Sequence, residues 1–295
     1  MADWGPALPD MVLSTLYIIF LLILATSSDN FFKTPFYVFF ISTGTYSVTA
    51  IISYYVFERF QFSEQWWTIY FYKPAYALNA IGAFGATMGK TNIVIHRYLV
   101  MKSRDFAETN WPRRVVFRIL LVQFIILVLL TTSIWPATYI YANNETKDRI
   151  VGLSDLEVTI QIAIAVTIYV MYIVCSVVFT ILTSRELIRI RGMLENSTDA
   201  SKKIMTRQRT MIIIVGICSV THLLKMIQQV GFHISSERAC RDRYTSTFQY
   251  PLFNGLASYA APVCLIALSP TVRARILTVF KIRRARNITA VVTVT

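Results

Sequence analysis

Residues 156–182 read LEVTIQIAIAVTIYVMYIVCSVVFTIL, and Glu157 is the only charged residue among them. An α-helix needs about 20 mainly apolar residues to cross the roughly 30 Å of hydrocarbon in a bilayer. Helical structure is required there because lipid offers no hydrogen-bond partners to backbone N–H and C=O groups. The sequence therefore predicts that this stretch is a transmembrane helix.

Six further apolar blocks of similar length occur along the 295 residues. The chain is 55% hydrophobic and only 15% charged, whereas a soluble domain carries about 25% charged residues. Seven helices with short connections use nearly the whole chain. We therefore predict an all-α membrane protein with one seven-transmembrane domain, residues 1–295, of which residues 269–295 are a cytoplasmic tail. The predicted spans are 8–26, 36–57, 74–100, 115–140, 156–182, 210–233 and 248–268.

A signal peptide is the alternative interpretation of the first apolar block. Signal peptides begin with a basic region, whereas Asp3 and Asp10 make this amino end acidic. The block also lacks a clear cleavage site between small residues. We therefore expect it to be retained as the first helix.

Basic residues are distributed unequally between the two ends of the predicted bundle. One end carries 20 Lys+Arg and 6 Asp+Glu, and the other carries 7 Lys+Arg and 10 Asp+Glu. By the positive-inside rule the basic end is cytoplasmic, which places the N-terminus outside and the C-terminus inside. We assign the net charge of +13 to this asymmetry and to anionic membrane lipid, and expect no nucleic-acid partner. The basic end comprises loops 27–35, 101–114 and 183–209 and the tail, with Arg97 and Arg118 counted at its boundary.

Motifs of enzymes and metal sites are missing from the sequence. No HExxH, GxSxG or GK[ST] pattern occurs, and no two carboxylates are paired within a predicted span. His222 and His233 lie about 16 Å apart along one helix, which is too far to share a metal ion. We therefore predict no enzymatic activity, no catalytic residues, no metal and no cofactor.

Three N-x-[ST] sequons occur, at Asn144, Asn196 and Asn287. Only Asn144 lies in a predicted outer loop, because the charge asymmetry places the other two in the cytoplasm. Asn144 is therefore the predicted glycosylation site.

The cytoplasmic segment 183–209 combines two basic helical extensions with a polar turn at residues 196–201. This pattern predicts a docking surface for an acidic partner, and the alternative is that the basic side chains only anchor the spans at lipid headgroups. After Pro270, apolar residues recur at helical spacing among basic ones, which predicts a short amphipathic helix on the inner leaflet. The candidate docking residues in segment 183–209 are Arg185, Arg189, Lys202, Lys203 and Arg207.

Lys225 lies about two turns from the outer end of the sixth predicted span, where a charge is costly and tends to be functional. His222, three residues earlier, shares its helix face. Lys225 either pairs with Glu157, faces a wet cavity or extends to the headgroups, and the polar amides nearby either line that cavity or join helices. We interpret the group as a ligand pocket in the outer half of the bundle. Its candidate residues are Tyr76, Asn79, His222, Lys225, Gln229, Asn254 and Tyr259.

The third predicted span carries a second buried cation, Lys90, seven residues before Arg97. Lys90 either joins an inner polar network or extends toward the inner headgroups, and we favour the second. Gly82, Gly85 and Gly89 recur nearby at a spacing that indicates close helix packing rather than a binding site.

The third predicted span ends in His96-Arg-Tyr-Leu-Val100, and the seventh contains Asn254-Gly-Leu-Ala-Ser-Tyr-Ala-Ala-Pro-Val-Cys-Leu265. Through these stretches, and over essentially its whole length, the chain resembles the nematode serpentine chemoreceptors, class V of the class-gamma superfamily. Further matches are Asp29–Tyr37, Val122–Phe124, Leu182–Leu187, His222 with Gln228–Gln229, and Leu268–Arg273.

The resemblance implies a G-protein-coupled chemosensory receptor at the plasma membrane, with the cilia of sensory neurons as a candidate location. It implies two partners, a small-molecule ligand and a heterotrimeric G protein. By analogy with the arginine switch of such receptors, Arg97 and Tyr98 are expected to reach the G protein together with the basic segment 183–209. His96 stands where an acidic residue is expected before the arginine, so the partner that holds Arg97 at rest is not given by the motif.

A ligand-gated channel or a small-solute carrier is the alternative function. Seven-helix odorant channels place the N-terminus inside, opposite to the charge asymmetry found here. Carriers usually show paired repeats or broken helices in matching halves, and neither is visible in this sequence. We therefore favour the receptor.

Overall fold

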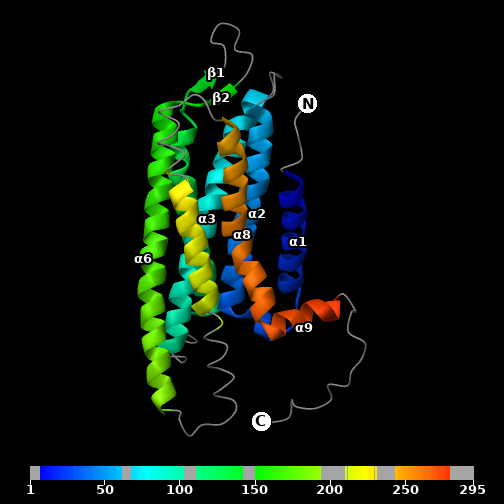
Figure 1. Cartoon of the computed structure of the whole chain (residues 1–295), viewed down its shortest axis with the longest axis vertical. Helices are drawn as coiled ribbons and strands as arrows, with labels where there is room; N and C mark the ends of the chain where they lie inside the picture. Colours follow the sequence, from blue (N-terminus) through cyan, green and yellow to red (C-terminus); the bar gives the residue numbers. More distant parts are fainter. Residues whose placement is uncertain are drawn as a thin grey trace.

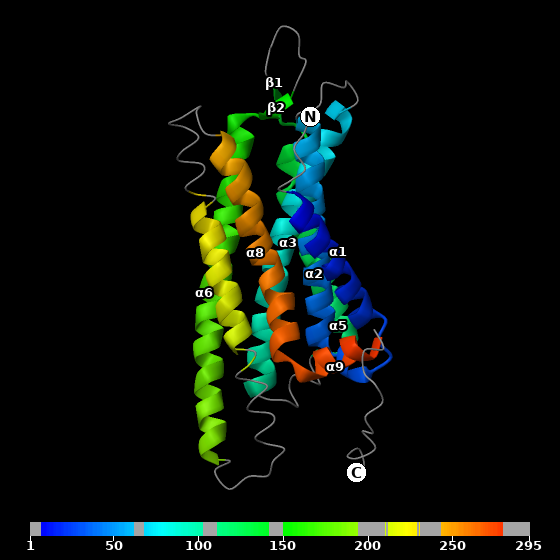
Figure 2. The ribbon, with the colours of Figure 1, turned by 45° about the vertical axis from the view of Figure 1, so that its right-hand side comes forward.

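The structure is a computed structural model that describes residues 7–61, 68–102, 111–141, 150–193, 210, 212–228, 230 and 243–279. These residues form a seven-helix bundle whose long helices run side by side, with a short helix across one end (Figures 1 and 2). The predicted fold class is confirmed. The helices are α1 (Ala7–Ala25), α2 (Pro35–Gln61), α3 (Thr68–Lys102), α5 (Arg113–Leu130), α6 (Asp155–Met193), the sixth-span helix (Ile212–Gln228), α8 (Arg243–Leu268) and α9 (Pro270–Val279).

Helix α3 passes through the bundle against α2, and small residues allow the two backbones to come close. A Cβ added to Gly82 would lie 2.5 Å from the backbone nitrogen of Ala50 on α2, and one added to Gly85 would lie 2.6 Å from the ring of Tyr46. The close helix packing predicted from the glycine spacing is therefore present. It matters for the site because α2 and α3 supply two of its walls.

This packing predicts that Gly82→Ala destabilises the receptor, because the added methyl group meets backbone that cannot rotate away. Overpacking of this kind costs about 1–3 kcal/mol. Gly216 in the sixth-span helix offers a matched control, since a Cβ there would meet nothing within 4 Å. Thermal unfolding of the purified receptor should show a lower midpoint for Gly82→Ala and an unchanged or slightly higher one for Gly216→Ala. Equal midpoints would contradict the described α2–α3 contact.

Helix α5 ends at Leu130, ten residues before the end of the predicted fourth span at residue 140. A 3-10 turn, Thr132–Ile134, follows, and the chain then enters strand β1 (Tyr139–Tyr141), which pairs antiparallel with β2 (Ile150–Leu153). Regular helical backbone ends at Thr131, the first of three hydroxyl residues at 131–133. The hydroxyl groups of Thr131 and Thr132 donate to the carbonyl oxygens of Val128 and Leu129, and such local bonds compete with helical ones. Apolar residues resume at Ile134 and Trp135, and the predicted range, which included them, was longer than the helix.

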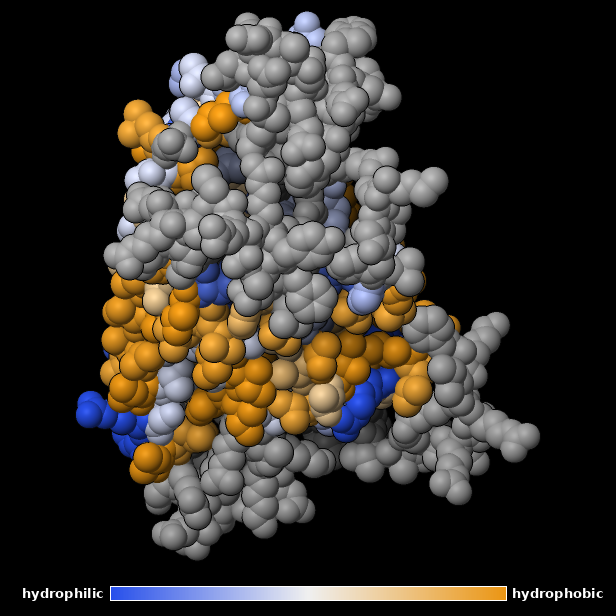
Figure 3. Space-filling model, turned by 45° about the horizontal axis from the view of Figure 1, so that its top comes forward, coloured by the Kyte–Doolittle hydropathy of each residue, from blue (hydrophilic) through white to orange (hydrophobic). Residues whose placement is uncertain are grey.

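In the described part of the chain, three helical stretches are long and apolar enough to cross a membrane by length and composition: Pro35–Val56, Arg114–Ile134 and Leu156–Arg189. The bent pair Phe253–Leu268 and Pro270–Val279 passes the same test when taken together. Shorter apolar helices cover Pro9–Ala25 and Ile212–Gln228. Hydrophobic side chains cover the middle of the visible face in Figure 3, as expected for a surface in contact with lipid.

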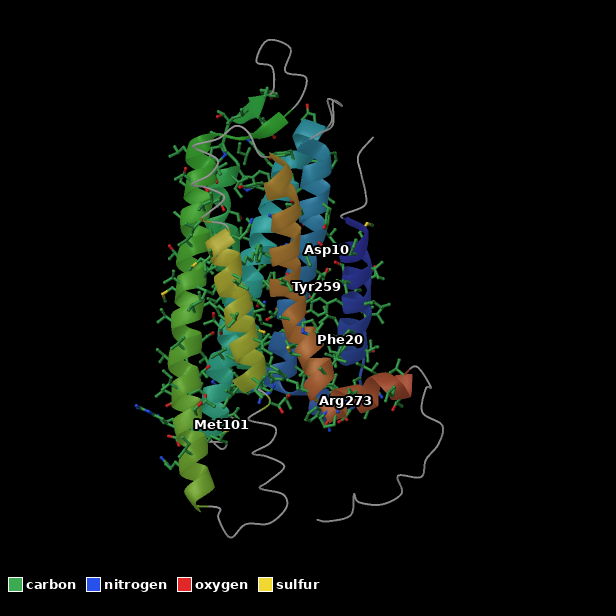
Figure 4. All side chains as sticks on the ribbon, in the orientation of Figure 1. Asp10, Phe20, Met101, Tyr259 and Arg273 are labelled. Carbon is green, nitrogen blue, oxygen red and sulfur yellow. The ribbon has the colours of Figure 1, made fainter. Side chains whose placement is uncertain are left out.

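Helix α9 leaves the end of α8 at a bend of 91° and lies across the end of the bundle (Figure 1). Val272 of α9 is fully buried in a hydrophobic cluster with Leu24 of α1, and Ile276 packs against the same cluster. The short amphipathic helix predicted after Pro270 is therefore present. It lies at the end of the bundle where α3 ends at Met101 and Lys102, and Asp10 of α1 lies farther toward the other end (Figure 4).

The strands β1 and β2 lie at the other end of the bundle (Figure 1). Asn144, between them, lies outside the described residues. Because the charge asymmetry makes this end extracellular, we expect translation with microsomes to attach glycan to Asn144, and Asn144→Gln to abolish the shift in mobility. Glycan on Asn196 or Asn287 in the Asn144→Gln variant would contradict the orientation.

Candidate functional site

A small cavity lies between α2, α3, the sixth-span helix and α8. Asn254 and Ala257, on its α8 wall, are near the middle of that helix, so the cavity lies at mid-depth in the bundle. This is deeper than the outer-half pocket predicted from the sequence. Its polar lining residues are Ser47, Thr87, Lys90, His222, Lys225, Asn254 and Ser258.

Lys225 is only 4% exposed, and its ammonium group is held inside the bundle. Lys225 Nζ donates a hydrogen bond of 2.6 Å to Asn254 Oδ1 on α8. The same nitrogen lies 5.6 Å from the ring centroid of Tyr169 on α6, within the range of a cation–π interaction. Lys225 therefore faces the cavity and does not extend to the outer headgroups.

Lys90 also points into the bundle, so the favoured prediction that it extends to the inner headgroups is wrong. Its Nζ donates to the carbonyl oxygen of Ala257 at 2.6 Å and lies 3.2 Å from His222 Nε2. The carbonyl oxygen of Ala257 and the imidazole of His222 thus hydrogen-bond to the ammonium group in place of lipid headgroups. This arrangement depends on three helices meeting at one depth.

The tautomer of His222 follows from its neighbours. Its Nδ1 lies 2.8 Å from the carbonyl oxygen of Cys218, and a carbonyl oxygen can only accept, so Nδ1 carries the proton. Nε2 then presents its lone pair to Lys90. The ring is enclosed by Tyr172 and Tyr169 on α6, at centroid distances of 4.8 and 6.1 Å. His222 therefore acts as a neutral acceptor and adds no positive charge to the cavity.

The cavity holds two cations, and within the described residues no carboxylate contacts either of them. Glu157, the acid that could have paired with Lys225, instead accepts hydrogen bonds from Ser133 at 3.0 Å and Gln161 at 2.9 Å. Buried charges normally have partners of opposite charge. The site as built is therefore complementary to an anion.

At the inner end of α3, the Arg97 guanidinium lies 4.3 Å from the centroid of the Phe36 ring on α2. The ring of His96 packs against Trp111 and Phe39, at 5.3 and 6.1 Å between centroids. His96 is thus turned away into an aromatic cluster. Aromatic contacts, in place of the acidic neighbour of other receptors, surround the two residues.

Three more of the candidate coupling residues belong to the same end of the bundle. Tyr98 packs against Phe179 of α6 at 5.3 Å between ring centroids. Arg189, on the extension of α6, lies 3.5 Å from Glu186 and is 67% exposed. Arg185 is exposed as well. Lys202, Lys203 and Arg207 lie outside the described residues.

The family model described as serpentine type 7TM GPCR chemoreceptor Srv matches residues 10–282. The chain belongs to the Srv family. No curated protein matches the chain. Membership of Srv confirms the resemblance to nematode serpentine chemoreceptors and identifies a multi-pass membrane receptor. It also favours a receptor over the alternative of a channel or carrier.

The structure of this Srv chemoreceptor brings together three of the predicted pocket residues, His222, Lys225 and Asn254, at one cavity. Tyr259 faces α1 instead, where its hydroxyl lies 2.7 Å from that of Ser14; Figure 4 shows it beside Asp10.

The other predicted pocket residues lie away from the cavity or outside the described residues. Tyr76 stacks on Tyr72 at 6.3 Å in a separate hydrophobic cluster. Asn79 is not among the lining residues and lies about 16 Å above Lys90 along α3, while the side chain of Gln229 is outside the described residues.

Sequence reasoning did not place Lys90, Ser47, Thr87 and Ser258 in the pocket. Two of them follow from helical spacing: Thr87 precedes Lys90 by three residues, and Ser258 follows Asn254 by four, so each pair shares a face. Ser47 gave no such signal, because its position depends on the packing of α2 against α3. The hydroxyl of Ser47 is buried and has no hydrogen-bond partner within the described residues.

Proposed function

We propose that this Srv chemoreceptor detects a small anionic ligand that binds between Lys225 and Lys90 in the mid-depth cavity. The observation that carries the proposal is the pair of buried ammonium groups with no carboxylate partner in the described part of the chain. An anion there gains charge-assisted hydrogen bonds, which are about twice as strong as neutral ones. The neutral His222 and the hydroxyl of Ser47 supply further polar contacts at the same cavity.

Signalling would follow from where the two lysines are attached. Lys90 is on α3, seven residues or about 10 Å before Arg97, and Lys225 is on the sixth-span helix. A ligand held by both helices favours whichever bundle state brings those groups closer to it, and so shifts the equilibrium between states. We infer that this shift exposes Arg97, Tyr98 and the basic segment 183–209 to a heterotrimeric G protein.

The proposed location is the plasma membrane, and the expression site proposed from the family is the cilium of sensory neurons. We also expect the basic residues of the cytoplasmic face to contact anionic membrane lipid.

The experiment that tests the ligand class is a matched panel of small carboxylates, alcohols and amines of equal carbon number. Cells that express the receptor at the surface would be compared with cells that carry an empty vector, using a cyclic-nucleotide or calcium readout. We expect responses to carboxylates and none to the matched amines, because a third cation would be repelled by the two lysines. Responses confined to amines would contradict the proposal.

A further inference from the structure

A second cavity lies on the inner side of the polar one and is lined almost entirely by apolar side chains. It is larger than the polar cavity. The lining includes Phe36, Phe40, Tyr172, Ile214 and Leu265. Arg97 lines its inner end.

The two cavities are stacked along the bundle and meet at Lys90, which lines both. On α8, Ala257 lines the polar cavity and Ala261 the apolar one. On the sixth-span helix, His222 lines the polar cavity and Cys218 the apolar one. Four residues are one helical turn, or about 5.4 Å. On both helices, therefore, the apolar cavity follows the polar one at an offset of one turn.

We propose that the two cavities form one bipartite site whose ligand is an amphiphilic carboxylate, with its head group at Lys225 and Lys90 and its aliphatic tail in the apolar cavity. This inference rests on the anion site proposed above and adds the chemistry of the rest of the ligand. The carboxylate is assigned to the polar end, because both lysines line that end. Beyond Lys90, the apolar cavity offers only the Arg97 guanidinium, the Tyr172 hydroxyl and the Cys218 thiol as donors. An alkyl chain fits only the apolar end.

The tail would also reach the inner end of α3. Phe36 and Arg97, which are in contact with each other, both line the apolar cavity. A tail long enough to fill the cavity therefore touches Arg97, which is proposed above to reach the G protein. A short anion occupies only the polar cavity and does not contact Phe36 or Arg97.

The direct test measures binding of unbranched carboxylates from acetate to decanoate to the purified receptor in nanodiscs of uncharged lipid, by thermal stabilisation. Each buried methylene should raise affinity about fourfold until the cavity is full, after which affinity should level off or fall. Alcohols of the same length should bind more weakly at every length. Affinity that does not depend on chain length would overturn the inference and leave the anion site intact, whereas no binding by any carboxylate would overturn both.

Variants at Ala261 assign the tail to the apolar cavity. Ala261→Leu and Ala261→Phe place bulk in that cavity one turn below the polar site, so short carboxylates should bind as in the wild type while the gain with chain length is reduced or lost. Binding of the short anion reports that each variant is folded, and the smaller leucine serves if phenylalanine is not accommodated. Full chain-length dependence in both variants would overturn the inference.

A comparison of Lys225→Met with Arg97→Met locates the head group. The proposal predicts that Lys225→Met loses carboxylate binding at all lengths, whereas Arg97→Met retains binding of the short carboxylates, which occupy only the polar cavity. The opposite result would place the carboxylate at the inner end and overturn the proposed orientation.

Discussion

Lys225→Met should abolish the response to a carboxylate agonist at equal surface expression, whereas Lys225→Arg should retain part of it. Truncating one partner of a buried, hydrogen-bonded charge pair costs about 2–5 kcal/mol, or roughly 30-fold or more in affinity. Arginine keeps the charge but presents it as a planar fork in a small cavity, so its positioning differs from that of the ammonium group. The measurement is the concentration-response curve of each variant with the same agonist.

A matched control for Lys225→Met exists on the same protein. Lys73 has the same side chain, but its Nζ donates to the carbonyl oxygen of Trp135 in an exposed contact away from the cavity. Lys73→Met should therefore leave the response close to that of the wild type. Equal potency of Lys225→Met and wild type would return Lys225 to a structural role.

The thermal stability of the ligand-free receptor also distinguishes a ligand-binding role of Lys225 from a structural one. A lysine at mid-membrane costs about 2.5–3.5 kcal/mol on insertion scales, and methionine of similar length removes that cost. The ligand-free Lys225→Met receptor should thus unfold at the same temperature as the wild type or a higher one, although Asn254 loses its hydrogen-bond partner. A residue that helps ligand binding while reducing stability is expected at a functional site.

The bundle could be predicted from the sequence because apolar blocks of about 20 residues permit only helices in lipid. The end of α5 could not, since Ile134, Trp135 and Ile140 continue the apolar block beyond the three hydroxyl residues at 131–133, where the helix ends. Composition reports what lipid tolerates, and local backbone chemistry decides where the helix ends. The extension of α6 to Met193 could be predicted, because residues 183–193 contain no proline that would interrupt the helix.

The site was predicted in part for a related reason. Reasoning along one helix identified Lys225 and His222 as neighbours, but the depth of one helix relative to another is set by packing. Lys90 was therefore assigned to the inner half of the bundle, although α3 brings it to the same cavity. Tyr259 shows the opposite error, since it lies five residues, or about 140° of helix rotation, from Asn254 and so faces α1.

Arg97→Ala should abolish G-protein signalling while binding of a short carboxylate, measured directly, stays close to wild type. The reason is position: Arg97 lies at the inner end of α3, about 10 Å along the helix from Lys90, and contributes to the apolar cavity but not to the polar one. Wild-type signalling in Arg97→Ala would reduce this arginine to an anchor at the membrane interface.

A substitution of Phe36 is expected to raise signalling, whereas Arg97→Ala abolishes it. Its ring lies 4.3 Å from the Arg97 guanidinium, and a cation–π contact contributes about 0.5–2 kcal/mol, more when it is shielded from water. Phe36→Leu removes that contact and keeps an apolar side chain, so the arginine is released more easily and signalling without ligand should rise several-fold. The double variant with Arg97→Ala should be silent, because release of the arginine has no effect once the guanidinium is absent. Unchanged basal signalling in Phe36→Leu would show that other neighbours of Arg97 hold it in the resting state.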